Sequence, residues 1–313
     1  MTQTPHDNTP PARSAARSLA VIAAVLAACA GMAWAGSHGG AAVRGVPVFM
    51  VVVGWILLAQ VVAFVPSWLA RTERYFDLVG SLTFVTAAVG GLVLSGHADG
   101  PALLLAGAVV VWAARLGWFL FARVRRSGGD GRFDAITTDA ARFLVVWVTQ
   151  GLWVTVTLSA VLAAVTAADR PTFSAVMIVG LMVWLLGFAV EVAADTQKSR
   201  FRADPANASD FIRTGLWAWS RHPNYFGEIV CWLGLALASV PALRGWQYAT
   251  LLSPVFVLVL LTRVSGIPLL ERRADARWGG QPDYQEYRAS TSVLVPLPPR
   301  RTRSGASTLG EPR

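Results

Sequence analysis

The sequence predicts an all-α protein, a polytopic bundle of about eight transmembrane helices with both termini in the cytoplasm. Of its 313 residues, 54% are hydrophobic and only 14% are charged, and the mean hydropathy is positive. Soluble proteins carry about 25% charged residues. Apolar runs recur along the whole chain, and the basic residues that give the net charge of +9 fall mostly between them. This pattern indicates contact with anionic lipid headgroups, and nucleic-acid binding is not expected.

Each apolar run approaches the ~20 residues that a helix needs to cross the hydrocarbon of a membrane. The first run ends in Ala33-Trp34-Ala35, which has the small-x-small pattern of a signal-peptide cleavage site, so this run is either an uncleaved anchor, the alternative we favour, or a cleaved signal. The runs lie near residues 18–35, 46–68, 76–95, 101–122, 141–167, 172–193, 225–241 and 246–265.

The segments outside these runs predict the ends and the orientation of the chain. Residues 1–17 are polar and rich in Thr, Pro and Ala, and residues 299–313 are polar and basic, so both tails are expected to be disordered. If the N-terminus is cytoplasmic, the 27 Lys and Arg residues lie in cytoplasmic segments with four exceptions. Arg44, Arg170 and Arg244 lie outside, and Arg115 lies within a run. This asymmetry predicts that both termini are inside.

Ionisable residues within or beside the runs indicate a polar site. A charge near the middle of a membrane costs roughly 3 kcal/mol unless it is paired or hydrated. We therefore expect these residues to share one cavity that opens to the cytoplasm; the alternative is that each one only snorkels or caps a helix. The residues are Asp77, Arg115, Glu191, Glu228 and Arg263.

The segment from Glu191 to Arg202 has the spacing of a charged helix face. Glu191, Asp195 and Lys198 stand at i, i+4 and i+7, on one face of a helix that Pro205 ends. Lys198, Arg200 and Arg202 exceed the acidic partners near them. This excess favours binding of an external phosphate, because guanidinium groups match phosphate oxygens; an ion-pair ladder at the end of the helix is the alternative.

The segment Ser220 to Glu228 is expected to start the next helix. Pro223 excludes helical geometry from the residue before it and suits the first position of a helix. Asn224 and Glu228 would then lie in the first turns, with Arg221 and His222 beside the positive end of the helix dipole. Such a helix start is a natural site for an anion.

These residues resemble a known family. GxxxEVxADxQKxxFR, TGLWxxSRHPNYFGE, SGIPLLE from Ser265 and YQEY from Tyr284 are similar to the bacterial branch of the steroid 5-alpha-reductase family, DUF1295, over roughly residues 70–298. The resemblance implies an integral reductase of the bacterial cytoplasmic membrane, with its active site facing the cytoplasm. Such a reductase uses NADPH to saturate a C=C bond conjugated to a carbonyl in a lipid-like or steroid-like substrate. Residues 18–298 would form the reductase-like domain, and residues 172–298 its cofactor-binding half.

The resemblance also implies site residues. In the N-terminal half, Asp77 and Trp112 stand where steroid reductases carry an acid and a tyrosine that grip the substrate carbonyl. Protonated Asp77, Trp112 through its indole N–H, and Arg115 are each candidates to donate a hydrogen bond to the oxygen that becomes negative as hydride arrives. The cofactor site would be lined by Glu191, Asp195, Lys198, Arg200, Arg202, Arg221, His222, Asn224, Tyr225, Glu228 and Glu271.

Two other classes of protein stay open. Isoprenylcysteine and phospholipid methyltransferases, which use S-adenosylmethionine, share an RHPxY-type segment, although the basic residues 198–202 favour NADPH. A transporter or scaffold is less consistent with charges on one side of the membrane and with a chain that has no internal repeat. Tyr284 and Tyr287 either cover the cofactor or belong to an ordinary packing segment. Cys29 and Cys231 lie in apolar runs and are expected to be buried, so no metal site is predicted.

Overall fold

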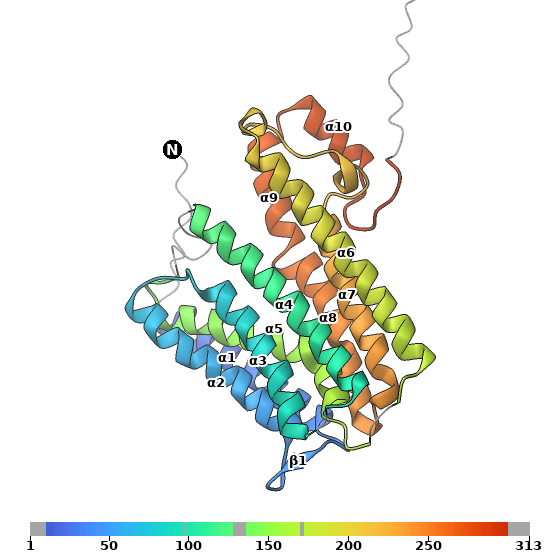
Figure 1. Ribbon diagram of the computed structural model, residues 1–313. Helices are drawn as coiled ribbons and strands as arrows, with labels where there is room; N and C mark the ends of the chain where they lie inside the picture. Colours follow the sequence, from blue (N-terminus) through green and yellow to red (C-terminus); the bar gives the residue numbers. More distant parts are fainter. Residues whose placement is uncertain (1–10, 97, 128–135, 170–171, 300–313) are drawn as a thin grey trace, which may run out of the picture. The chain divides into compact units, whose positions relative to one another are not determined.

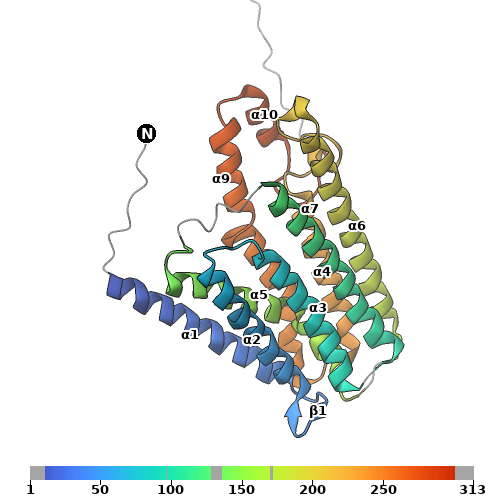
Figure 2. The ribbon, with the colours of Figure 1, turned by 60° about the vertical axis from the view of Figure 1, so that its left-hand side comes forward.

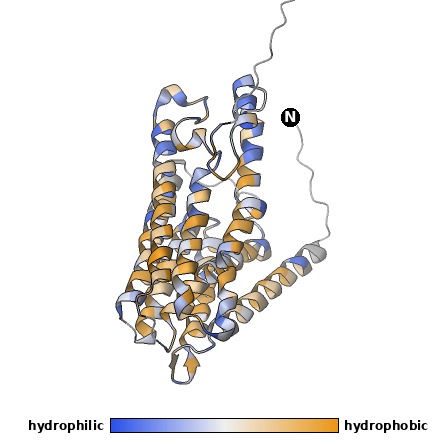
Figure 3. Ribbon diagram, turned by 90° about the vertical axis from the view of Figure 1, so that its right-hand side faces the viewer, coloured by the Kyte–Doolittle hydropathy of each residue, from blue (hydrophilic) through white to orange (hydrophobic). Residues whose placement is uncertain are grey.

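The computed structural model describes residues 11–96, 98–127, 136–169 and 172–299 (Figure 1). Within these ranges, eight helices are long and apolar enough to cross a membrane, which confirms the predicted fold class. Their bodies are mostly apolar, and hydrophilic residues concentrate at helix ends and in loops (Figure 3). The side of the membrane on which each loop lies stays a prediction. The candidate spans are Ala15–Gly36, Val48–Leu69, Phe76–Ser95, Gly100–Ala122, Ala140–Val165, Ala175–Ala203, Pro223–Ala242 and Gly245–Trp278.

The first helix is longer than expected. Helix α1 (Pro11–Gly36) includes residues 11–17, for which the sequence predicted disorder. The reason is local, because this segment is rich in Ala and Arg, which are strong helix formers, and Pro11 occupies the first position, where proline is tolerated. Residues 1–10 and 300–313, the rest of the two predicted tails, lie outside the described residues.

The chain divides into two compact units, residues 1–180 with 235–253 and residues 181–234 with 254–313. In the first unit, α5 is mostly buried and contacts α1, α2 and α3, which lie beside it in Figures 1 and 2. Asp139 begins α5, because its carboxylate accepts hydrogen bonds from the backbone N–H groups of Ala141 and Arg142. Besides α1, the main elements of this unit are β1 (Ala42–Val43), β2 (Val46–Pro47), α2 (Val48–Leu69), α3 (Phe76–Ser95), α4 (Gly100–Ser127), α5 (Ala140–Val165), η3 (Val240–Ala242) and η4 (Gly245–Leu252).

The second unit holds most of the predicted cofactor-binding half 172–298, although residues 172–180 and 235–253 belong to the first unit. The run predicted at 246–265 is not one regular α-helix, because η4 is a 3₁₀ helix and η5 is a π-helical turn. The elements that lie wholly or largely in this unit are α6 (Ala175–Ala203), η1 (Pro205–Asn207), η2 (Gly215–Ala218), α7 (Pro223–Ser239), α8 (Ser253–Val259), η5 (Leu260–Val264), α9 (Ile267–Trp278) and α10 (Pro282–Ser290).

Helices α6 and α7 approach each other at two glycines. A Cβ atom placed at Gly187 would lie 2.5 Å from the backbone nitrogen of Cys231, and one at Gly227 would lie 2.6 Å from that of Glu191. Only glycine permits backbones to pack this closely, as in other helix pairs with small residues at the crossing. The crossing brings the start of α7 beside the charged face of α6.

Candidate functional site

Three side chains form a buried ionic cluster beside the N-terminus of α7. Glu271 on α9 places Oε1 2.7 Å from His222 Nε2 and Oε2 3.1 Å from Arg221 Nη1. The side chains of His222, Arg221 and Glu271 are only 6%, 11% and 18% exposed. One carboxylate therefore holds two neighbouring residues of the segment that the sequence singled out.

The protonation of His222 follows from these contacts. Burial lowers the pKa of His222; Glu271 opposes this effect, and the positive charges of Lys198 and Arg221 add to it. The neutral imidazole then donates from Nε2 to Glu271, which leaves a lone pair on Nδ1. Nδ1 is buried and has no hydrogen-bond partner in the described part of the chain, and the same holds for Nε and Nη1 of Arg221, whose ion pair with Glu271 is close but not aligned as a hydrogen bond.

The lowered pKa predicts how stability depends on pH. The unfolded chain binds a proton at His222 near pH 6.5, whereas the folded protein binds it only at lower pH. The stabilising contribution is therefore complete above about pH 6.5 and is lost as the pH falls toward the folded-state pKa. We expect unfolding measurements across this range to give a smaller pH slope for His222→Gln than for the wild type. Equal slopes would contradict a buried neutral imidazole.

The face of α6 contributes a second polar group. Asn224 Nδ2 donates to Asp195 Oδ1 at 3.2 Å, and Cys231 Sγ lies 4.0 Å from Glu191 Oε2. Asp195 and Glu191 are both buried. The predicted helix face and the predicted position of Asn224 in the first turn of α7 are thus confirmed, and the glycine crossing explains why they meet.

The three cations near the end of α6 do not all lie on one face of the helix. Lys198 Nζ lies 4.4 Å from the centre of the Trp217 ring, and its charge acts on His222. An α-helix turns by about 100° per residue, so Arg202 lies on the same face as Lys198 and Asp195. By the same rotation Arg200 lies on the opposite face of the helix, and both arginines are exposed. A common phosphate site for the three cations stays a prediction.

Aromatic residues border the cluster. The Tyr225 ring stacks on His222, with centroids 5.7 Å apart and planes at 11°. The hydroxyl of Tyr287 donates to the carbonyl of Trp217 at 2.7 Å, and burial raises its pKa, so it remains a donor at neutral pH. Glu228 is half-buried on α7. Tyr225 and Glu228 therefore occupy the first turns of α7, as the sequence predicted.

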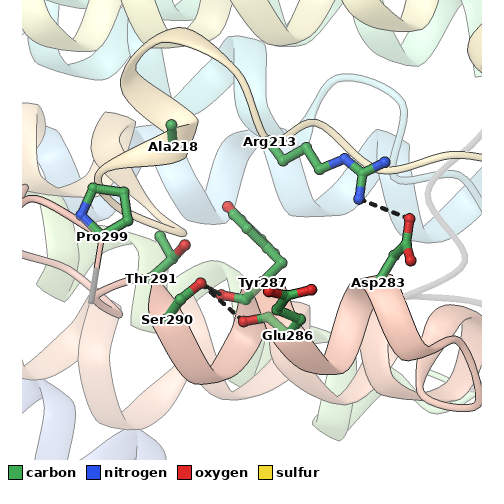
Figure 4. Close-up of a pocket in the computed structure, with 8 residues that line it drawn as sticks. All are labelled: Arg213, Ala218, Asp283, Glu286, Tyr287, Ser290, Thr291 and Pro299. Atoms are coloured by element: carbon green, nitrogen blue, oxygen red, sulfur yellow. Dashed lines mark hydrogen bonds and ion pairs between the residues drawn. The ribbon is translucent and has the colours of Figure 1, made fainter. Parts of the chain in front are cut away.

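Tyr287 also faces a surface hollow of about 220 Å³. In Figure 4, Arg213 and Asp283 point toward each other across one end of this hollow, with 3.1 Å between Nη1 and Oδ2. Both side chains are largely exposed. The hollow is lined by Arg213, Ala218, Asp283, Glu286, Tyr287, Ser290, Thr291 and Pro299.

The three predicted catalytic residues lie in the first unit. Trp112 is buried, and its ring meets the edge of Phe84 at a centroid distance of 5.2 Å. Asp77, half-buried in the first turn of α3, precedes Phe84 by seven residues, which is about 10 Å along the helix axis. Asp77 and Trp112 therefore lie at different levels of this helix pair. Arg115 is half-buried, with its guanidinium 5.4 Å from the Phe119 ring centre.

The cavity expected to join five charged groups stays a prediction. Asp77 and Arg115 belong to the first unit, whereas Glu191, Glu228 and Arg263 belong to the second. The role of Asp77, Trp112 or Arg115 as hydrogen-bond donor to a substrate carbonyl likewise stays a prediction.

Ser220 is a residue beside the cluster that the sequence pattern did not single out. Its hydroxyl is fully buried, accepts from the backbone N–H of His222 at 3.1 Å and donates to the carbonyl of Leu294 at 2.7 Å. The only local signal is a small hydroxyl residue immediately before Arg221 and His222. The bond to Leu294 joins distant parts of the chain and has no signature in the local sequence.

Comparisons with known proteins add the following findings. A family model described as "Protein of unknown function (DUF1295)" matches residues 63–291. The protein named 3-oxo-5-alpha-steroid 4-dehydrogenase 1 is 33% identical to this chain in Bos taurus and 28% identical in Rattus norvegicus, over 119 residues in each case. These residues make up 38% of this chain and 40% of each relative, so the chain spans about two fifths of the length of the curated relatives it matches. No solved structure matches the chain.

Proposed function

The chain belongs to the DUF1295 family, and from this premise we propose that it is a multi-pass membrane oxidoreductase that uses NADPH to saturate an activated, enone-type C=C bond. The proposed substrate is lipid-like or steroid-like and reaches the protein from the surrounding membrane lipids. The names of the Bos taurus and Rattus norvegicus relatives, which describe a dehydrogenase of a 3-oxo-steroid, support this reaction class. We place the protein in a bacterial cytoplasmic membrane, with the site facing the cytoplasm.

The buried Arg221–Glu271–His222 cluster is the observation that carries the proposal. Buried polar atoms are nearly always hydrogen-bonded, so Nδ1 of His222 and Nε of Arg221 indicate that a polar group completes this site. The amide of Asn224 lies close by in the same segment and both donates and accepts hydrogen bonds. These groups suit a dinucleotide, which combines amide, hydroxyl and phosphate groups. When bound, NADPH supplies the hydride; the residues named here bind and orient it.

Ligand-dependent melting of the detergent-purified protein tests the proposal. A ligand present at about 100 times its Kd stabilises the folded state by about 2.7 kcal/mol. We expect NADPH to raise the melting temperature of the wild type and to raise it much less in Asn224→Ala. Oxidation of NADPH should then depend on a 3-oxo-4-ene steroid or a comparable enone lipid. A shift with S-adenosylmethionine and none with NADPH would overturn the reductase and favour a methyltransferase.

The geometry of α6 predicts which cation selects NADPH over NADH. Arg202 shares the site face with Lys198, and Arg200 does not, so Arg202 is the better partner for the 2′-phosphate. We expect Arg202→Ala to weaken NADPH about tenfold, the effect of losing one charge-assisted hydrogen bond, with little change for NADH. The matched control Arg200→Ala should bind both cofactors as the wild type does. Binding titrations that give equal losses for both cofactors in Arg202→Ala would contradict this assignment.

A further inference from the structure

The segment that follows α10 lies beside the residues that carry the ionic cluster. The carbonyl of Ser292 accepts from the backbone N–H of Arg221 at 2.9 Å, and the backbone N–H of Leu297 donates to the carbonyl of Trp219 at 3.1 Å. Ser220 and Ser292 form a parallel bridge. Residues 292–297, which we call the strap, thus contact residues 219–221 through a single β-bridge and a further backbone bond at Leu297.

The hydroxyl of Ser220 joins the strap to His222. It donates to Leu294 in the strap and accepts from the backbone N–H of His222, and the Ser220 side chain is fully buried. Both residues that bind Glu271 therefore have their backbone N–H groups held: Arg221 by the strap directly, and His222 through Ser220. Neither bond is part of a regular helix, because α7 begins only at Pro223.

We propose that the strap, acting through Ser220, is a positioning element that fixes Arg221 and His222 in the geometry needed to bind the cofactor. This inference rests on the proposed function. The match to the family model ends at residue 291, so the strap lies just beyond the matched region. Helix α10 leads into the strap, and its Tyr287 hydroxyl is bonded to the carbonyl of Trp217, so the strap is tied to the same loop at its near end.

The physical reason is that the two side chains are only partly anchored. Arg221 forms an ion pair with Glu271, and His222 hydrogen-bonds Glu271 and stacks on Tyr225, but several of their buried nitrogen atoms have no hydrogen-bond partner among the described residues. Their backbone bonds therefore contribute to holding them in position. Binding groups must be held within about 0.5 Å of the productive geometry, so a loosened backbone lowers affinity even when the fold is intact.

Ser220→Ala tests the strap, with Ser290→Ala as the matched control. Ser290 lies directly before the strap region, but its hydroxyl bonds only carbonyls of its own helix, Glu286 at 2.8 Å and Tyr287 at 3.3 Å. We expect Ser220→Ala to weaken NADPH binding about tenfold in a protein that still folds, with a lower melting temperature because a buried N–H and a carbonyl lose their partner. Ser290→Ala should bind as the wild type does. Wild-type affinity in Ser220→Ala would overturn the proposal.

A second readout does not depend on cofactor binding. The chain has four histidines, so ¹³C-labelled imidazoles can be followed by NMR and His222 assigned from the His222→Gln spectrum. Burial is the main cause that lowers the pKa of His222. The charges of Lys198 on α6 and of Arg221 lower it further, whereas Glu271 on α9 raises it. A loosened strap hydrates the ring, so its titration should move to higher pH in Ser220→Ala. An unchanged titration would also overturn the proposal.

A second pair of variants covers the case in which Ser220→Ala does not fold. Leu297→Pro removes the N–H group that bonds Trp219, whereas Leu297→Ala keeps it, and the Leu297 side chain is 51% exposed. We expect weaker NADPH binding and a shifted His222 titration in the proline variant alone. If the wild type binds no NADPH, the proposed function fails, and the His222 titration still decides whether the strap positions the cluster.

Discussion

Replacing Glu271 by Gln is expected to lower the free energy of unfolding by about 3 kcal/mol and to abolish cofactor binding. Glu271 is the acidic partner of both Arg221 and His222, and all three side chains are largely buried. Gln has nearly the same shape, so the change removes the charge with little change in packing and leaves the Arg221 cation without this partner in a site of low polarity. Denaturant unfolding in detergent, followed by tryptophan fluorescence, measures the loss.

The neighbouring acid on α9 provides the control for this prediction. Asp275 Oδ1 lies 3.0 Å from Arg288 Nη1, one turn after Glu271, but both side chains of this pair are more than a third exposed. Exposed ion pairs contribute about 0–1 kcal/mol. Asp275→Asn should therefore unfold close to the wild type. Similar losses for the two variants would mean that burial of the Glu271 cluster does not distinguish it from a surface pair.

Gly227→Ala is expected to cost more than about 3 kcal/mol or to prevent stable folding of the second unit. The new Cβ would lie 2.6 Å from the nitrogen of Glu191 and 2.7 Å from the carbonyl oxygen of Gly187, and backbone atoms cannot move aside as a flexible side chain can. Overpacking in ordinary cores costs about 1–3 kcal/mol. Separation of α6 from α7 would also break the bond between Asn224 and Asp195.

Gly54→Ala on α2 is the matched control for the glycine crossing. A Cβ at Gly54 meets no atom within 4 Å, and Ala favours helix over Gly by about 1 kcal/mol. This variant should equal or exceed the wild type in melting temperature. A Gly227→Ala protein that has the melting temperature of the wild type and still binds NADPH would show that α6 and α7 do not need their close approach.

The sequence predicted the features that depend on local periodicity. Run lengths gave the eight spans, and the i, i+4, i+7 spacing placed Glu191, Asp195 and Lys198 on one face of α6. The same rotation places Arg200 on the opposite face from Lys198, which counting charges alone does not show. Helix α1 begins at Pro11, earlier than predicted, because the polar composition of residues 11–17 suggested disorder although their Ala content favours a helix.

Contacts between distant residues could not be predicted in this way. Glu271 entered the predicted site only through the family resemblance, because 49 residues separate it from His222 and no spacing rule links them. The bond between Ser220 and Leu294 spans 74 residues. Such contacts depend on the tertiary packing of the helices, which brings residues distant in sequence together. No local pattern in a single sequence indicates that packing.

The separation of Ser220 from Leu294 has a consequence for biosynthesis. Translation at about 5–20 residues per second makes the carbonyl that Ser220 binds roughly 4–15 s after Ser220 itself. Leu294 also follows the last of the eight candidate spans, which ends at Trp278. A nascent chain halted before Ser292 would therefore contain every candidate span while the backbone of Arg221 and His222 still lacked its bonds to the strap. The strap can therefore dock on this segment only after all the candidate spans have been synthesised.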